Sequence, residues 1–260
     1  MSYSGPYRRQ MSISFGGPLT PGIKAIILVT AGFFVLQLLL RGMVSSPSPM
    51  GIGPVERWLG LFPPAVIPGL QIWRPVTWLF VHGGIGHIVI NMLFLFMFGC
   101  RLERDWGTHA FVRYYFICGI GAALFTFLPF AQFYNVNHIG ASGAVYGVLL
   151  AFGLFYPRSV IYVLATFPVE ARYFMIVMGF VAFAGSLGGA GSGISHIAHL
   201  GGIVVGYIYL RWVGVKRWRG PNFLSSLREA YRRWRIKRLR KKFERYYEER
   251  TGDSSKYKYH

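Results

Sequence analysis

The strongest constraint on this chain is a series of apolar segments with few charges, each close to the length that crosses a lipid bilayer. A helix needs about 20 residues to span the roughly 30 Å of hydrocarbon. Only 14% of the 260 residues are charged, whereas soluble domains carry about 25%. The sequence therefore predicts an all-α polytopic membrane protein with six spans. The spans are expected at about 23–40, 83–100, 110–134, 139–156, 173–190 and 194–213.

The segments between and around these spans divide the chain into three parts. Residues 1–22 are polar and rich in glycine and proline, and we expect an N-terminal cytoplasmic tail without a cleavable signal peptide. Residues 23–213 form the expected membrane domain, with the loop 41–82 on the outer side, and residues 214–260 form a basic cytoplasmic tail. The apolar run 160–169 is too short to span and is expected at the membrane interface.

The distribution of basic residues predicts the orientation of the spans. The tail after residue 213 contains sixteen Lys and Arg against five Asp and Glu, and the connections 101–109 and 157–172 each carry two arginines. The segments 131–138 and 186–196 carry none. Because basic loops tend to stay in the cytoplasm, both termini are expected there. The starts of the fourth and sixth spans are then expected toward the outer side.

The basic tail predicts a helix that lies on the membrane surface. Within 221–250, Lys and Arg dominate, while apolar residues recur at helical spacing at Leu224, Leu227, Tyr231 and Trp234. A helix of this kind binds anionic lipid headgroups, with about 1 kcal/mol per basic residue near the surface. We expect no nucleic-acid partner, because charge is the only feature that would support one.

Ser142 stands between small residues at the head of the fourth apolar segment, after Gly140 and before Gly143. At a helix N-terminus the backbone N–H groups are unpaired and the macrodipole favours negative charge. A tetrahedral oxyanion formed at Ser142 would therefore find a donor in the serine's own N–H. The alternative is structural, because Gly143-x-x-x-Gly147 is also a helix-packing pattern.

His199 lies at an equivalent depth in the sixth apolar segment, where a histidine is costly and by default marks a functional site. Gly202 and Gly206 share its helical face and would let the sixth helix approach the fourth closely enough for a Ser–His hydrogen bond. Tyr146, four residues after Ser142, could stack on the imidazole. The pair predicts nucleophilic catalysis, with His199 as general base and then general acid. The alternative is an interhelical hydrogen bond without catalysis.

His87 and Asn91 lie four residues apart in the second span and project from one face. Both side chains can donate hydrogen bonds, which suits either an oxyanion site or a polar clamp between helices. Of the nine acidic residues, only Glu56 is expected on the outer side, far along the first loop. The sequence therefore predicts a Ser–His dyad without a carboxylate.

Together these residues resemble the rhomboid family of intramembrane serine proteases, across about residues 73–206. Each motif is weak alone, but their order and their placement on predicted helices make the set specific. No catalytic position is substituted, which argues against inactive relatives. The motifs are Trp73-Arg74, His87-x-x-x-Asn91, Glu103-x-x-x-Gly107, Gly140-Ala-Ser142-Gly143 and His199-x-x-Gly202-x-x-x-Gly206.

The resemblance implies a six-helix bundle around a water-filled cavity open to the outside, with Ser142 below the membrane surface. It implies hydrolysis of a peptide bond in or beside a transmembrane helix of a substrate protein, with His87, Asn91 and the Ser142 amide as the oxyanion site. It further implies that 186–195 is a mobile cap and that the fifth helix is a lateral gate. We expect no cofactor and no metal, and an N-terminus that does not resemble a transit peptide favours a bacterial inner membrane or another plasma membrane.

Two other functions are compatible with parts of the sequence. A metal or haem could use histidines expected on the outer side, but no His-Glu-x-x-His motif and no nearby carboxylate accompany them. A non-catalytic chaperone or quality-control factor could use the same fold to bind transmembrane helices. A transporter is disfavoured, because no internal inverted repeat is found. The histidines in question are His82, His87, His138, His196 and His199.

Overall fold

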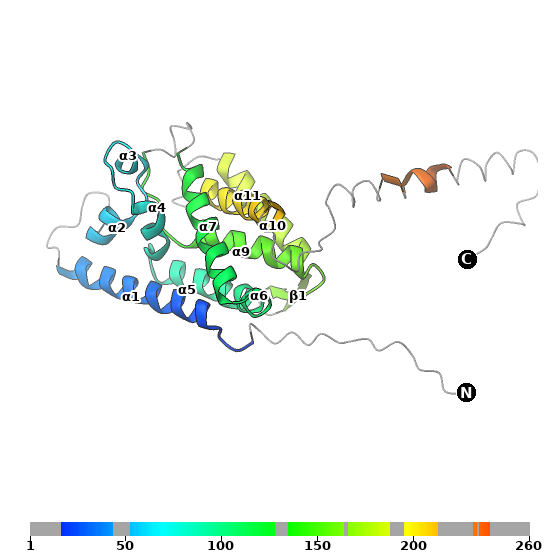
Figure 1. Ribbon diagram of the computed structural model, residues 1–260, viewed down its shortest axis with the longest axis horizontal. Helices are drawn as coiled ribbons and strands as arrows, with labels where there is room; N and C mark the ends of the chain where they lie inside the picture. Colours follow the sequence, from blue (N-terminus) through cyan, green and yellow to red (C-terminus); the bar gives the residue numbers. More distant parts are fainter. Residues whose placement is uncertain are drawn as a thin grey trace, which may run out of the picture. The chain divides into compact units, whose positions relative to one another are not determined.

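The structure, a computed structural model, describes residues 17–43, 53–127, 135–163, 166–187, 195–212, 231–232 and 234–239. The chain divides into two compact units, Met1–Trp218 and Arg219–His260. The first unit is mainly helical (Figure 1). Its elements are α1 (Pro21–Met43), α2 (Pro54–Leu59), α3 (Pro63–Val66), α4 (Arg74–Thr77), the 3-10 helix η1 (Trp78–Phe80), α5 (Ile85–Phe94), the π-helix η2 (Leu95–Gly99), α6 (Cys100–Trp106), α7 (Thr108–Phe125), α9 (Ser142–Phe155), β1 (Val160–Val163), β2 (Phe167–Glu170), α10 (Ala171–Leu187) and α11 (His196–Trp212).

Each predicted span overlaps helix in the described residues, although the third, 110–134, extends past the end of α7 at Phe125. α5 and η2 cover most of the second predicted span, 83–100, and α6 continues the helix without a break beyond it. By length and composition, two of the described helical stretches, Pro21–Arg41 and Ile85–Trp106, could cross a membrane, and α9 and α10 are shorter apolar helices. The number of crossings and the side on which the termini lie stay predictions.

The run 160–169 is folded differently from the all-α prediction. β1 pairs with β2 in an antiparallel hairpin, with Val160 opposite Glu170 and Val163 opposite Phe167. Branched and aromatic side chains favour strands because they pack well on a pleated surface. The all-α prediction is therefore wrong for this segment, while its expected location at the membrane interface stays a prediction.

Parts of the predicted organisation lie outside the described residues. Of the predicted surface helix 221–250, the residues 231–232 and 234–239 are described and are helical. There the Arg238 guanidinium lies 5.2 Å from the centre of the Trp234 ring. Most of the predicted N-terminal tail and of the predicted cap 186–195 lies outside the described residues.

α9 is the helix around which the bundle packs. It contacts α7 and α11 along its length, and α10 packs on α11 (Figure 1). A Cβ added to Gly202 of α11 would lie 1.9 Å from the Gly143 carbonyl oxygen of α9, and one added to Gly147 would lie 2.5 Å from Cys118 Sγ of α7. Only residues without a side chain allow these backbones to come so close.

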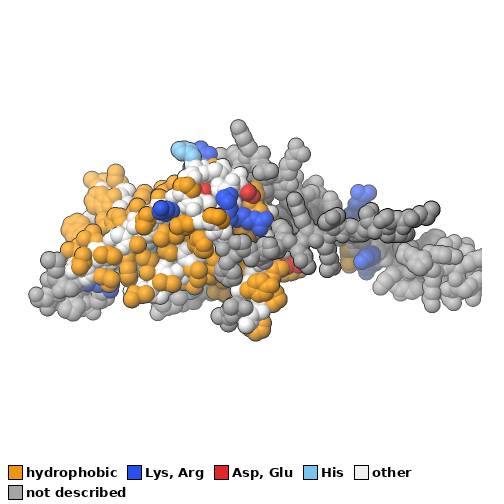
Figure 2. Space-filling model, turned by 90° about the horizontal axis from the view of Figure 1, so that it is seen from below, with side chains coloured by type: hydrophobic (Ala, Val, Ile, Leu, Met, Phe, Trp, Pro, Cys, Tyr) orange, Lys and Arg blue, Asp and Glu red, His pale blue; other side chains and the backbone are white. Residues whose placement is uncertain are grey.

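Hydrophobic side chains cover much of the outside of this unit. In Figure 2 they occupy most of the described surface that faces the viewer. Large exposed patches of this kind mark a surface that contacts something other than water, and a lipid bilayer fits long apolar helices best. Exposed examples on α1 are Leu28, Val35 and Leu39, and on α10 they are Ile176, Val177 and Phe180.

A buried carboxylate from α6 holds the start of α1. Glu103 accepts hydrogen bonds from the backbone N–H groups of Gly22 (2.7 Å) and Ile23 (3.0 Å). The hydroxyls of Thr20 and Thr108 also donate to it. The first N–H groups of a helix have no partner within the helix, and the macrodipole places positive partial charge there. A carboxylate at this position therefore accepts hydrogen bonds from these groups and is attracted to that charge.

Gly107 joins α6 to α7. Its φ of +83° lies in the left-handed region that glycine adopts readily, and its N–H donates to the Glu103 carbonyl at 2.8 Å. The motif Glu103-x-x-x-Gly107 therefore has a structural role, at the joint of α1, α6 and α7.

We expect Glu103→Gln to lower the free energy of unfolding by about 1–3 kcal/mol, because an amide NH2 would face N–H donors that need an acceptor. Thermal unfolding in detergent measures the change as a lower Tm. Glu170→Gln is the matched control, since that carboxylate pairs with Arg172 at a partly exposed site. Equal Tm values for the two variants would contradict the role assigned to Glu103.

We also expect Gly202→Ala to destabilise the protein by about 1–3 kcal/mol, because the added methyl group overlaps the backbone of α9. Gly32→Ala on α1 is the control, since a Cβ there meets nothing within 4 Å. The control should be neutral or stabilising, by up to about 1 kcal/mol from helix propensity alone. A Gly202→Ala variant as stable as Gly32→Ala would show that the helices can separate at no cost.

Candidate active site

Ser142 is the first residue of α9, and the turn before it is held by backbone contacts. Gly140 has a φ of +117° and donates its N–H to the Trp78 carbonyl at 3.0 Å. The Ala141 N–H points at His82 Nε2, 3.4 Å away. The serine therefore stands at the unpaired, electropositive end of a buried helix, where negative charge on a bound group is favoured.

The structure brings Ser142 and His199 together. Ser142 Oγ lies 2.7 Å from His199 Nε2, although the two residues are 57 positions apart in the chain. The Tyr146 ring stacks on the imidazole, with ring centres 4.3 Å apart and an angle of 9° between the planes. His199 is buried, and its Nδ1 has no hydrogen-bond partner among the described residues. The imidazole is thus oriented by a ring stack and by its helix, in place of a carboxylate.

The glycines of the two helices make this contact possible. Gly143 and Gly202 are the pair whose backbones touch, one position after Ser142 and three positions after His199. Gly206 lies one turn further along, where a Cβ would come within 2.6 Å of the Tyr114 hydroxyl oxygen and 3.4 Å of Gly147 Cα. The face shared by Gly202, Gly206 and His199 is therefore the face that packs on α9.

His87 lies against the turn that precedes Ser142. A Cβ on Gly140 would be 2.7 Å from His87 Cε1 and Nε2, and the Gly83 N–H donates to His87 Nδ1 at 3.2 Å. Asn91 Nδ2 donates to the His87 carbonyl at 2.8 Å. An amide carries two N–H donors, so this bond leaves one for another acceptor. Both residues stand on α5, and the assignment of an oxyanion role to them stays a prediction.

Trp73 and Arg74 organise the loop between α1 and α5 and do not contact the serine–histidine pair. Trp73 Nε1 donates to the Trp58 carbonyl at 3.2 Å. The buried Arg74 donates to the carbonyls of Arg57 (2.7 Å) and Gly60, at the end of α2. A planar guanidinium suits this task because its fork can reach two acceptors at once. These two residues support the loop that flanks the site.

Other histidines surround the pair without forming a metal site in the described part of the chain. The His196 ring centre lies 5.8 Å from that of His199, and His82 and His87 are 5.0 Å apart. Among the described residues, no group of three or more His, Cys, Asp or Glu side chains is placed to hold a metal ion. His138 pairs with Leu61 through two backbone hydrogen bonds of 2.8 Å.

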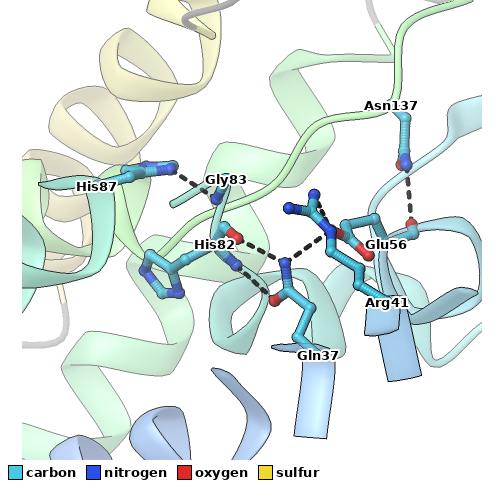
Figure 3. A network of polar contacts seen from close by, with 7 residues as sticks. All are labelled: Gln37, Arg41, Glu56, His82, Gly83, His87 and Asn137. Carbon is cyan, nitrogen blue, oxygen red and sulfur yellow. Dashed lines mark hydrogen bonds and ion pairs between the residues drawn. The ribbon is translucent and has the colours of Figure 1, made fainter. Parts of the chain in front are cut away.

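Sequence reasoning missed a set of buried polar groups beside the site. Figure 3 shows Gln37 of α1 bonded to Glu56 of α2 and to the backbone of His82. Glu56 is buried, and its position in the first loop gave no sign of this. A glutamine within an otherwise apolar span was the available signal, because polar groups in a span are costly.

This geometry is that of a helical membrane protein with a serine–histidine pair where two tightly packed helices begin. Residues 69–216, more than half of the chain, match the family described as the Rhomboid domain. The chain belongs to the rhomboid family, whose members are integral membrane proteins.

Individual relatives agree with this assignment. The chain is 30% identical over 154 residues to the rhomboid protease AarA of Providencia stuartii, and this match covers 52% of this chain and 53% of that protein. It is 27% identical over 217 residues to the rhomboid protease GlpG of Yersinia enterocolitica, and this match covers 80% of this chain and 68% of that protein. It is 33% identical over 150 residues to RHOMBOID-like protein 4 of Arabidopsis thaliana. That match covers 57% of this chain but 36% of the plant protein, so it spans well under half of that relative.

We expect Gly140→Ala to disturb the site and lower stability, because the new methyl group would meet the His87 ring and a left-handed φ costs a non-glycine residue about 1–2 kcal/mol. Thermal unfolding measures this loss as a reduced Tm. Gly84→Ala is the control: its φ of 169° is extended, and a Cβ there meets nothing within 4 Å. If both variants unfold at the same temperature, the packing of His87 on Gly140 is not tight.

Proposed function

We propose that this protein is an intramembrane serine endopeptidase that cleaves peptide bonds in or next to transmembrane helices of membrane proteins. The observation that carries the proposal is the 2.7 Å contact between Ser142 Oγ and His199 Nε2 at the start of two packed helices. Its occurrence in a chain of the rhomboid family, with relatives named as rhomboid proteases, supports the same conclusion.

The dyad works by transfer of one proton between two side chains. With the imidazole neutral and its proton on Nδ1, Nε2 accepts the Ser142 proton as the oxygen attacks the scissile carbonyl. The imidazolium then donates that proton to the leaving amine, and an acyl-enzyme remains on Ser142. Water, activated by His199, hydrolyses the ester and restores the serine. A ring held by the Tyr146 stack keeps Nε2 directed at the oxygen throughout.

The negative charge that develops on the carbonyl oxygen needs donors near Ser142. The serine's own N–H is available, because it belongs to the first turn of α9. His87 and Asn91 supply the others in this proposal: His87 lies beside Gly140, and Asn91 retains one amide hydrogen. Each such donor is worth about 100- to 1,000-fold in rate where it has been removed in other serine proteases.

The proposed substrates are membrane proteins whose transmembrane helix unwinds easily next to small residues. An intact helix shields its carbonyls with hydrogen bonds, so a cut requires local unwinding. In this proposal both termini are cytoplasmic, the site opens to the outer side of a bacterial inner membrane, and the basic tail 214–260 binds anionic lipid. The many lysines and arginines of that tail support the lipid contact.

The direct test is cleavage of a single-span substrate with small, helix-weak residues, by purified protein in liposomes. We expect Ser142→Ala and His199→Ala each to lower turnover by at least about 1,000-fold, since the two groups act as a unit. Thr126→Ala and His109→Ala are matched controls and should cleave like the wild type. Thr126 donates its hydroxyl to the Ala123 carbonyl of its own segment, and His109 lies exposed in α7.

Each rival function gives a different result in the same assay. Cleavage that survives Ser142→Ala but stops with a metal chelator would replace the dyad with metal chemistry. Binding of the substrate without cleavage by any form, across several substrates, would make the protein a non-catalytic membrane-protein binding or quality-control factor.

A further inference from the structure

A connected set of buried polar groups lies beside the candidate active site (Figure 3). Gln37, Glu56 and His82 are each at most 2% exposed. A buried carboxylate is stable only when it is paired, and Glu56 forms an ion pair with Arg41 and accepts a hydrogen bond from Gln37 Nε2 at 2.7 Å. None of these side chains, Gln37, Arg41, Glu56 and His82, belongs to the dyad or to its proposed oxyanion donors.

Gln37 uses its whole amide to bind two other segments. Its Nε2 donates to Glu56 Oε1 and to the His82 carbonyl, the latter at 2.6 Å, and its Oε1 accepts from the His82 N–H at 3.2 Å. Three bonds restrict a buried amide to one orientation. The backbone of His82 is therefore held by both its donor and its acceptor to a side chain of α1.

From His82 the contacts continue to the site in two directions. The ring Nε2 accepts from the N–H of Ala141, the residue before Ser142, at 3.4 Å. The next residue, Gly83, donates its N–H to His87 Nδ1 at 3.2 Å. One short segment thus touches both the turn that presents Ser142 and a proposed oxyanion residue.

The protonation state of His82 fits this arrangement. Burial and, to a smaller extent, the neighbouring His87 lower the pKa of His82 to about 4, although a hydrogen bond to the Phe80 carbonyl acts in the opposite direction. The ring is therefore neutral at neutral pH. With its proton on Nδ1, 3.4 Å from the Phe80 oxygen, Nε2 is an acceptor for Ala141.

A second branch ties the same loop to the chain that leads into α9. Asn137 Nδ2 donates to the Glu56 carbonyl at 2.8 Å. Leu61 and His138 exchange two backbone hydrogen bonds, each of 2.8 Å. The segment 137–141 is consequently fixed to α2 at one end and to His82 at the other.

We propose that Gln37 and Glu56 are positioning residues for the proteolytic reaction, which hold His87 and the turn before Ser142 in place through His82 and Gly83. The inference rests on the proposed function. Stability alone does not require such a network, because a buried ion pair replaced by well-packed apolar groups is often neutral or stabilising. A fixed geometry does require it, since a misplacement of about 1 Å can lower turnover about 100-fold.

The first test compares Gln37→Met with Thr30→Val, both on α1, in liposomes with the single-span substrate. Thr30 is fully buried two turns earlier, and its hydroxyl has no hydrogen-bond partner among the described residues. We expect Gln37→Met to lower kcat about 10- to 100-fold with KM within about twofold of the wild type, because misplaced catalytic groups affect the transition state and not substrate binding. Thr30→Val should leave both constants unchanged. A loss confined to KM, or one equal to that of Thr30→Val, would overturn the inference.

A second pair of variants keeps the test decisive if Gln37→Met does not fold. Glu56→Gln retains an oxygen that can accept from Gln37, whereas Glu56→Ala removes it. We expect Glu56→Gln to keep kcat within about threefold of the wild type and Glu56→Ala to lose about 10- to 100-fold, at an unchanged KM. Equal kcat values for the two Glu56 variants would contradict the positioning role.

Wild type and Ser142→Ala in the same preparation separate this inference from the proposed function. If the wild type cleaves no faster than Ser142→Ala, the proposed function fails and the inference fails with it. If the wild type cleaves, Ser142→Ala does not, and Gln37→Met cleaves like Thr30→Val, the inference alone is wrong.

Discussion

The close approach of α9 and α11 is the contact on which the site depends. The backbone of Gly202 lies so near the Gly143 carbonyl that a single methyl group would overlap it. This distance lets two short side chains, from helices far apart in the chain, come within 2.7 Å of each other. Helix packing in a membrane gains little from the hydrophobic effect, so small residues that allow dense van der Waals contact take its place. The same glycines thus account for the helix packing and for the contact between Ser142 and His199.

Buried polar groups perform the complementary task of holding the loops. Glu103 satisfies the first N–H groups of α1, Arg74 satisfies the carbonyls at the end of α2, and Gln37 binds the backbone of His82. In each case one side chain supplies hydrogen bonds that water would supply at a soluble surface. Without water, backbone groups outside regular helices need such partners within the protein. The irregular segments around Ser142 are therefore ordered by side chains from distant helices.

Much of the helical architecture could be predicted because apolar length is a direct consequence of bilayer thickness. The pairing of β1 with β2 could not be predicted, since a short apolar run does not reveal whether it is helical or extended. Ser142 and His199 could be singled out as candidates because reactive groups are uncommon at the ends of apolar segments, and the structure brings the two side chains into contact. The sequence placed Glu56 in the first loop but did not reveal that it is buried or what it pairs with, because only the folded loop shows its contacts with Gln37 and Arg41.

The sequence by itself determined the class of protein, the positions of the helices and the residues able to carry chemistry, because these follow from local composition and spacing. Tertiary structure alone decided which side of α9 meets α11, that His82 lies against the turn before Ser142, and how α1 reaches the segment before α5. These outcomes depend on contacts between residues up to about 60 positions apart, such as the one between Ala141 and His82. Local patterns do not encode such contacts one residue at a time, because each depends on the packing of the whole bundle.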